Sequence, residues 1–242
     1  MLVNHIPEGW EIIHQRAHGV LAVQLAAQWK ASQRPARWVE TLLAVAEHDD
    51  AQEDWQGRNH LNENGTPLNF DQKLFSFTQM QRIAELSQHK SRWIALLISK
   101  HLSFLYEPMR DADKALPAFL DEQRAHQERW TAELGVKPAE VQYAYDLLQW
   151  CDQFSLILCK GDLPTGERAL EISKGPDGKV YQVRQLSEGP VTVTPWPFEA
   201  AEFSVTVEST LVRQLQFKND PELMAALKTS EVRPKVWQLR KG

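Results

Sequence analysis

The most restrictive feature of this sequence is a change in the spacing of its apolar residues near residue 160. Before that point, apolar residues recur about every 3.6 positions, which is the pattern of amphipathic α-helices. This spacing, or a composition rich in strong helix formers, predicts helices over residues 16–31, 36–48, 71–88, 91–106, 112–134 and 138–159. Residues 50–70 are polar and contain Asn, Gly and Pro, so they predict a long loop, and loops of this length are often functional.

After residue 160 the pattern changes to short alternating runs with frequent prolines, which is typical of strands and turns. Strands are expected at 168–174, 179–185, 190–194, 202–207 and 234–240, with the sequence GPDG as a hairpin turn. A short helix is expected at 220–228, capped by Asp220. The sequence therefore predicts a mainly α chain: a helical bundle over residues 1–160 and a small antiparallel β-sheet appendage over 161–242, packed on the bundle.

Composition narrows the classes of protein to which the chain can belong. Its 242 residues are 43% hydrophobic, enough for a substantial core, and its net charge is -5. The acidic surplus lies within residues 1–160 and argues against a surface that coats nucleic acid. There is no signal-peptide pattern and no apolar run long enough to cross a membrane. Cys151 and Cys159 share one apolar segment, so we expect no disulfide framework and a cytoplasmic location. The oligomeric state stays open, a homodimer included.

Four residues stand out because their polar side chains fall on or beside apolar helix faces. His18 precedes Val20 and Leu21, and Asp152 lies on a face with Tyr145 and Leu148. A buried carboxylate normally has a partner or a metal, since burying it alone costs several kcal/mol. His48 and Asp49 are neighbours at a predicted helix end, where the backbone can turn both side chains toward one ion. Two imidazoles and two carboxylates suit a borderline divalent metal. The competing interpretation is core histidines and a solvated helix end.

Other residues are candidates for supporting roles. His101 lies among apolar residues of its helix and could bind a second ion or donate to a phosphate oxygen, or it could be an ordinary core histidine. Gln15, one turn before His18, could touch substrate or order a water. Asp50 could orient a metal-bound imidazole, and His89 lies at a helix boundary, where caps are common. Within the loop, Trp55 could cover the site, and Arg58, with Lys73 nearby, could hold a phosphate.

The order of these residues resembles the HD-domain superfamily of metal-dependent phosphohydrolases. That superfamily has a His, then a His-Asp pair, then a distant Asp, each on a helix; here these are His18, His48-Asp49 and Asp152. The segments IIHQRAHGVLAVQLAAQW, LLAVAEHDD, LLISKHLSFL and LQWCDQFSLILC are also similar to an uncharacterised bacterial family of HD-like proteins. Many HD proteins follow the pair with an apolar residue, Gly and Lys, whereas this chain has Asp50-Ala51-Gln52-Glu53 and so lacks that lysine.

The resemblance implies a function and a ligand set. His18, His48, Asp49 and Asp152 would hold a divalent metal (Mn, Fe, Zn, Ni, Co or Mg, one or two ions), with Asp49 and His101 as the catalytic residues. The expected activity is hydrolysis of a small phosphorylated or nucleotide substrate by a metal-activated water. Two alternatives stay open: an HD-type di-iron oxidase or oxygenase, and a catalytically retired HD-like module that binds a ligand or a protein.

Overall fold

The computed structural model describes residues 1–49, 59–72, 76–187 and 189–242. Most of the predicted helices are confirmed, with shifted ends. α5 begins later than expected, at Leu116, with Pro117 in its first turn, and α3 begins after Ser76, whose side chain caps it. The six helices of the N-terminal two thirds are α1 (Gln15–Ala27), α2 (Trp38–Glu47), α3 (Phe77–Gln88), α4 (Arg92–Tyr106), α5 (Leu116–Leu134) and α6 (Pro138–Lys160).

The described strands form one seven-stranded sheet in the order β1-β2-β6-β7-β5-β4-β3. All neighbouring pairs are antiparallel except β5 and β7, which run parallel. The strands are β1 (Leu2–Ile6), β2 (Gly9–Ile13), β3 (Leu170–Lys174), β4 (Val180–Gln185), β5 (Val191–Thr194), β6 (Glu202–Val212) and β7 (Glu231–Arg240). The GPDG turn joins β3 to β4 as predicted, with Gly178 at a positive φ of 75°.

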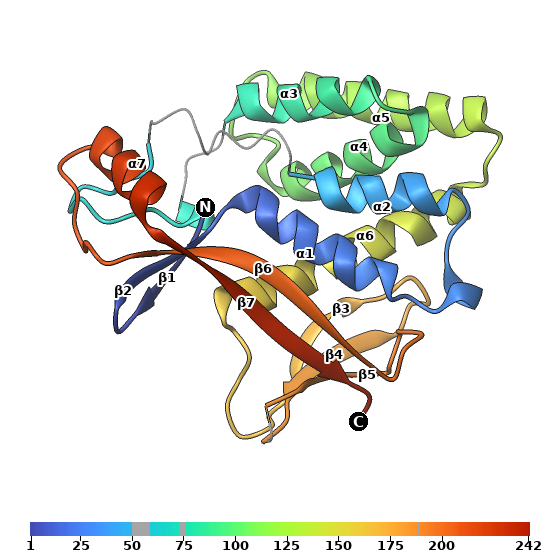
Figure 1. Cartoon of the computed structure of the whole chain (residues 1–242). Helices are drawn as coiled ribbons and strands as arrows, with labels where there is room; N and C mark the ends of the chain where they lie inside the picture. The colour runs from blue at the N-terminus through green and yellow to red at the C-terminus, as the bar shows by residue number, and fades with distance from the viewer. Residues whose placement is uncertain (50–58, 73–75, 188) are drawn as a thin grey trace.

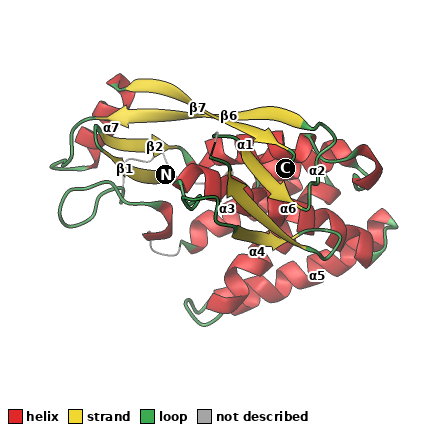
Figure 2. Cartoon of the chain, turned by 90° about the horizontal axis from the view of Figure 1, so that it is seen from below, coloured by secondary structure: helices red, strands yellow, loops and turns green. Residues whose placement is uncertain are grey.

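The predicted fold class, a mainly α bundle with a small C-terminal antiparallel sheet, is wrong. The chain is an α/β protein, because its first residues form the β1–β2 hairpin and β2 then pairs with the far end of β6. The sheet is thus assembled from both ends of the chain, and it is mixed and curled. Figure 1 shows α1–α6 on one side of the sheet, and Figure 2, seen from below, shows the strands crossing beneath them.

Aromatic residues join the helices to the curled sheet. Trp29, after α1, and Trp150, on α6, have ring centroids 5.1 Å apart, and both are fully buried. Tyr181 of β4 packs 5.5 Å from Trp150, and Phe198 lies 6.2 Å from Trp29. Burying rings of this size is a large apolar contribution. This cluster holds the sheet against α1 and α6, two of the helices that carry the predicted site residues.

The remaining helix, α7 (Asp220–Thr229), closes the far end of the sheet over a second apolar cluster that includes Met1, Ile12 and Phe217. Its cap is Asn219 rather than the predicted Asp220: the Asn219 side chain accepts from the Glu222 amide at 3.0 Å. The Asp220 carboxylate instead accepts from the backbone amides of Asn59 and His60, at 3.0 and 2.9 Å. Asp220 therefore anchors the described end of the predicted loop to the C-terminal part of the chain.

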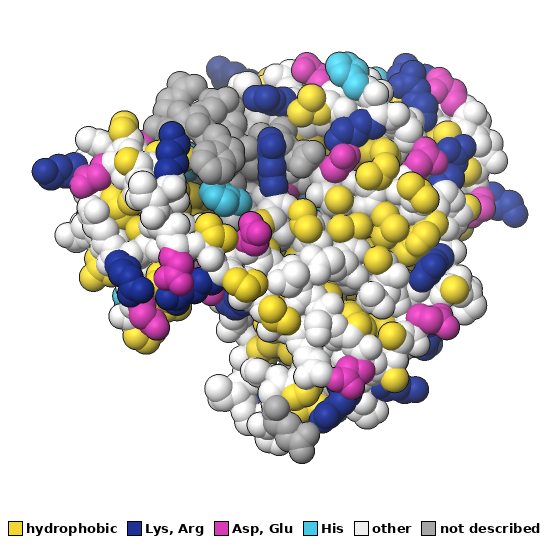
Figure 3. Space-filling view, in the orientation of Figure 1, with side chains coloured by type: hydrophobic (Ala, Val, Ile, Leu, Met, Phe, Trp, Pro, Cys, Tyr) yellow, Lys and Arg dark blue, Asp and Glu magenta, His cyan; other side chains and the backbone are white. Residues whose placement is uncertain are grey.

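The described surface carries exposed apolar side chains. Apolar side chains gather across the face seen in Figure 3, and Val20, Val39 and Leu43 of α1 and α2 are among the exposed ones. None of the described helices offers an 18-residue stretch apolar enough to cross a bilayer.

Candidate metal centre

His18 is placed by the close approach of α1 to α2. The residue is fully buried, and its Nδ1 donates to the Gln15 carbonyl of the preceding turn. The next residue, Gly19, has no side chain, and a Cβ there would lie 2.5 Å from the carbonyl oxygen of Ala46 on α2. A glycine is therefore required for the two backbones to come together at this point. This contact brings the ring of His18 beside the end of α2.

His48 is the C-terminal cap residue of α2 and repeats the arrangement of His18. Its ring is 1% exposed, and its Nδ1 donates to the carbonyl of Val45 at 2.8 Å. The Nε2 atoms of the two histidines lie 3.1 Å apart, with the rings almost perpendicular. Because α2 ends here, the following residue, Asp49, can turn to the same point, as the position of the pair at a helix end predicts.

The two carboxylates complete the group. Asp152 lies in the middle of α6, and its Oδ1 is 3.2 Å from His18 Nε2 and 3.1 Å from His48 Nε2. Asp49 Oδ2 is 3.5 Å from His18 Nε2 and 3.9 Å from His48 Nε2. The Nε2 of Gln15 donates to Asp49 Oδ2 at 2.9 Å and so fixes that carboxylate. Each aspartate side chain is 14% exposed, so the buried histidines are approached from the carboxylate side.

The four converging atoms share one property: in neutral rings, none of them carries a hydrogen. A carbonyl oxygen only accepts, so the Nδ1 of each histidine must hold its proton, which leaves the Nε2 as a lone pair. Two imidazole lone pairs and two carboxylate oxygens then face one another at 3.1–3.9 Å. Such an arrangement is stable only around a cation, either a proton on one ring or a metal ion.

The pKa shifts reflect the same crowding of acceptors. Burial alone would lower the pKa of His48, but the charges of Asp152 and Asp49 outweigh it and raise that pKa to about 10. Burial opposes ionisation of the carboxylates as well, yet the His48 charge lowers the pKa of Asp49 and holds that of Asp152 well below its usual range. With no metal bound, the group therefore holds a proton on an imidazole. A metal ion would have to displace that proton.

The spacing of the group fits one divalent ion. Ligand atoms about 2.1 Å from a common ion lie roughly 3.0 Å apart at neighbouring octahedral corners and about 3.4 Å apart at tetrahedral ones. The observed separations of 3.1–3.9 Å cover this range. In the described residues, His18, His48 and Asp49 form one group of potential ligands, and His48, His101 and Asp152 form another. Imidazole with carboxylate favours Mn, Fe, Co, Ni or Zn over Mg.

His101 lies next to this group, on α4. Its ring is 2% exposed and packs edge-on against His48, with centroids 5.2 Å apart. Burial and the neighbouring His48 charge lower its pKa to about 4, so the ring is neutral near pH 7. Its Nδ1 is buried and has no hydrogen-bond partner among the described residues. A buried polar atom of this kind is rare in folded proteins, and here it adjoins a cluster of metal-type ligands.

The remaining predicted site residues separate into three groups. Gln15 belongs to the centre, as described above. His89 is the exposed C-terminal cap residue of α3 and is not part of the group. Asp50, Trp55, Arg58 and Lys73 lie outside the described residues. Sequence reasoning missed Tyr106, whose pKa is raised to about 12 by burial and by the charge of Asp49. Its only sequence signal is its position one turn after Leu102, which marks it as facing the core.

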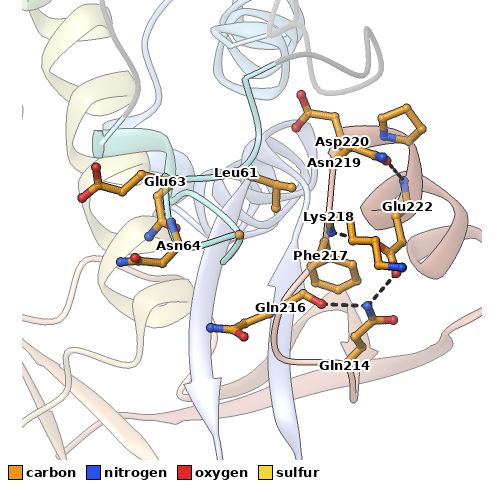
Figure 4. Close-up of a pocket in the computed structure, with 13 residues that line it drawn as sticks. Leu61, Glu63, Asn64, Gln214, Gln216, Phe217, Lys218, Asn219, Asp220 and Glu222 are labelled. Atoms are coloured by element: carbon orange, nitrogen blue, oxygen red, sulfur yellow. Dashed lines mark hydrogen bonds between the residues drawn. The ribbon is translucent and has the colours of Figure 1, made fainter.

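A hollow that shares no residue with this centre lies between residues 61–65 and the segment 214–222 (Figure 4), with a volume of about 610 Å³. Glu222 on its wall accepts from the backbone amide of Lys218 at 2.6 Å and from the Gln214 side chain at 3.0 Å. Asp220 holds the two loop amides already described. These acidic groups are therefore satisfied by the chain's own donors, and the hollow lacks the converging acceptors of the metal centre.

Comparison with known proteins gives a family without a function. Residues 1–214 match the family described as "Protein of unknown function (DUF3891)". The chain belongs to this family. No curated protein matches the chain, and no solved structure does. The matched range covers both strands of the β1–β2 hairpin and every residue of the candidate metal centre. What the site does must therefore be argued from its own chemistry.

Proposed function

We propose that this member of the DUF3891 family is a metal-dependent phosphohydrolase. His18, His48, Asp49 and Asp152 would hold a divalent ion, and a small phosphorylated substrate would react beside it. The observation that carries the proposal is the convergence of four atoms from α1, α6 and the end of α2, all of which are acceptors when the two imidazole rings are neutral. The reaction class comes from the resemblance of this ligand order to the HD superfamily and from the charge that a divalent ion brings to phosphoryl oxygens.

Several groups of the protein would position the ligands and the water for this reaction. A bound ion would supply Lewis acidity and lower the pKa of a water molecule on it. The carbonyls of Gln15 and Val45 hold both rings with Nε2 directed inward, and Gln15 holds Asp49. Asp49 is partly exposed, so its carboxylate can accept a hydrogen bond from a nucleophilic water and orient it. The neutral ring of His101, with its unpaired Nδ1, is available to a substrate oxygen or a second ion.

A second candidate function, oxidation by two irons, is favoured by one observation. His48, His101 and Asp152 bring ligand atoms within 4.8 Å of one another and share His48 with the group of His18, His48 and Asp49. The Nε2 of His48 can bind only one ion, so a bridge between two irons would come from a carboxylate such as Asp152, whose two oxygens can each bind one. Anaerobic purification followed by absorption spectroscopy separates the two functions. A di-iron band without phosphatase activity would favour the oxidase.

Elemental analysis of the purified protein tests the metal site directly. We expect about one or two divalent ions per chain, and loss of metal in Asp152→Ala. The matched control is Asp146→Ala, which removes a carboxylate from the same helix; the Asp146 side chain bonds to Gln142 at 2.6 Å, outside the centre. Metal retained fully in Asp152→Ala would refute the ligand set. A metal-free protein whose melting temperature ignores Mn, Fe, Ni and Zn would instead support the retired binding module.

Activity is measured on p-nitrophenyl phosphate and bis-p-nitrophenyl phosphate with the metal-loaded protein. We expect hydrolysis of at least one of these esters, and we expect His48→Ala to lower the rate far more than it lowers the melting temperature. A metal-loaded protein that hydrolyses neither ester, nor a panel of nucleotides, would refute the reaction class while leaving the metal site intact.

A further inference from the structure

A groove on the helical side of the molecule is separate from the metal centre. α5 and α6 both pack on α4, and two adjoining hollows of about 380 and 430 Å³ lie along the three helices. Each is within the range of roughly 300–1,000 Å³ typical of small-ligand sites. The walls of the first hollow are largely apolar and include Leu96, Ala132, Val136, Pro138 and Val141. An apolar wall of this kind accommodates an aliphatic chain rather than a polar ligand.

Lys100 marks the junction of the two hollows, since it lines both. Its Nζ lies 5.6 Å from the centroid of the Tyr145 ring, and its side chain is partly buried. Among the described residues it forms no ion pair. Asp146 attracts it from α6, but that carboxylate accepts its hydrogen bond from Gln142. A half-buried ammonium group beside an apolar hollow, with no counter-ion in contact, is a binding position for an anion.

The other charged groups of the groove do not compete for that anion. Glu107, in the second hollow, is paired with Arg110 at 2.9 Å and with Arg124 at 2.6 Å. Glu128, in the first hollow, is exposed and solvated at its rim. The cation available inside the groove is therefore Lys100.

We propose that this groove binds a medium-chain aliphatic carboxylate, with its acid group on Lys100 and its chain along the accessible wall residues Ala132, Val136 and Pro138. The site does not depend on the proposed hydrolase activity. Lys100 and the His101 ring both lie near the Tyr145 ring, with Lys100 Nζ 5.6 Å and the His101 centroid 6.3 Å from its centroid. Lys100 lines the groove, whereas His101 adjoins the metal centre. The ligand is selected by charge at one end and by apolar length at the other. A cation or a neutral chain of equal length should therefore bind less well.

Calorimetric titration of the full chain with dodecanoate tests the proposal. We expect saturable binding, with dodecyltrimethylammonium and dodecanol binding at least tenfold more weakly. Shortening the carboxylate should weaken binding by about fourfold for each methylene removed. Equal binding of the cation, or affinity that ignores chain length, would overturn the proposal. Binding of an acidic amphipathic peptide in the groove, without binding of dodecanoate, would also overturn the proposal.

Three variants locate the site. Lys100→Met should weaken dodecanoate about tenfold and leave dodecanol unchanged, and Ala132→Trp should block both because Ala132 is an exposed residue of the wall. Lys114→Met removes the same charge from an exposed lysine elsewhere and should change nothing. Circular dichroism confirms folding, and unchanged metal content separates this site from the metal centre. Unaltered dodecanoate binding in both Lys100→Met and Ala132→Trp would refute the assignment.

Discussion

Replacing Gln15 with methionine tests whether the metal centre depends on the group that orients its carboxylate. Gln15 is 2% exposed, and its Nε2 donates to Asp49 Oδ2 at 2.9 Å. Methionine keeps the length and volume of the side chain but removes the donor. A hydrogen bond to a charged group contributes about 1.5–3 kcal/mol, which corresponds to a loss of metal affinity of about 10-fold to 150-fold. Because the Asp49 side chain is 14% exposed, water can replace part of this bond, so we expect about 10-fold to 30-fold.

The assay is a titration of metal-free protein with Mn²⁺ or Zn²⁺ in competition with a chelating dye. Gln24→Met is the matched control. It removes a glutamine from the same helix. The Gln24 side-chain NH₂ donates to the Thr206 carbonyl at 2.8 Å, and its side-chain oxygen accepts from the Thr206 backbone amide at 3.0 Å, away from the centre. Stability should fall in both variants, but metal affinity only in Gln15→Met. Equal affinities in the two variants would show that Asp49 is not a ligand held by Gln15.

Three further outcomes follow from the structure. Gly19→Ala should destabilise the protein by about 2 kcal/mol or more, because the new Cβ meets the Ala46 carbonyl at 2.5 Å. The loss would be measured as a lower midpoint of unfolding in urea, and metal binding should weaken as well. Normal metal affinity in this variant would contradict the packing argument. Metal binding at pH 7 should release about one proton, because the pKa of His48 in the metal-free protein is about 10. Metal affinity should therefore rise with pH up to that value. The same heat of binding in buffers of different ionisation enthalpy would disprove the release of a proton. Thr41→Val should cost about 1–3 kcal/mol, because the buried Trp93 Nε1 loses the acceptor that it reaches at 2.9 Å, whereas Thr41→Ser should retain most of the stability in the same denaturation experiment.

The helices and the residues of the metal centre could be predicted because the information for them is local. Apolar spacing marks each amphipathic helix, and a histidine or aspartate on an apolar face is visible within a few turns of sequence. The order His18, His48-Asp49, Asp152 was therefore enough to name four residues that the structure places within 3.9 Å of at least one other member of the group. Gln15, one turn before His18, was visible in the same way.

The sheet could not be predicted, because its assembly depends on contacts between distant parts of the chain. β1 and β2 are five residues each, with mixed burial, and β6, which pairs with β2, is about 200 positions away. No local pattern distinguishes such a hairpin from an irregular N-terminus. The Asp220 carboxylate was misassigned for a related reason: a helix-cap signal is local, whereas its actual partners are the amides of Asn59 and His60.

The sequence by itself determined which residues could ligate a metal, which segments are helical, and that the chain has no long apolar span. Only the tertiary structure decided that the candidate ligands meet, because this requires Gly19 to bring α1 against α2 and α6 to present Asp152 to both histidines. It also decided that both Nδ1 atoms are committed to carbonyls, and so that the inward atoms are all acceptors when the rings are neutral. The sequence gives the type of each residue, whereas the direction in which a side-chain lone pair points depends on the surrounding backbone.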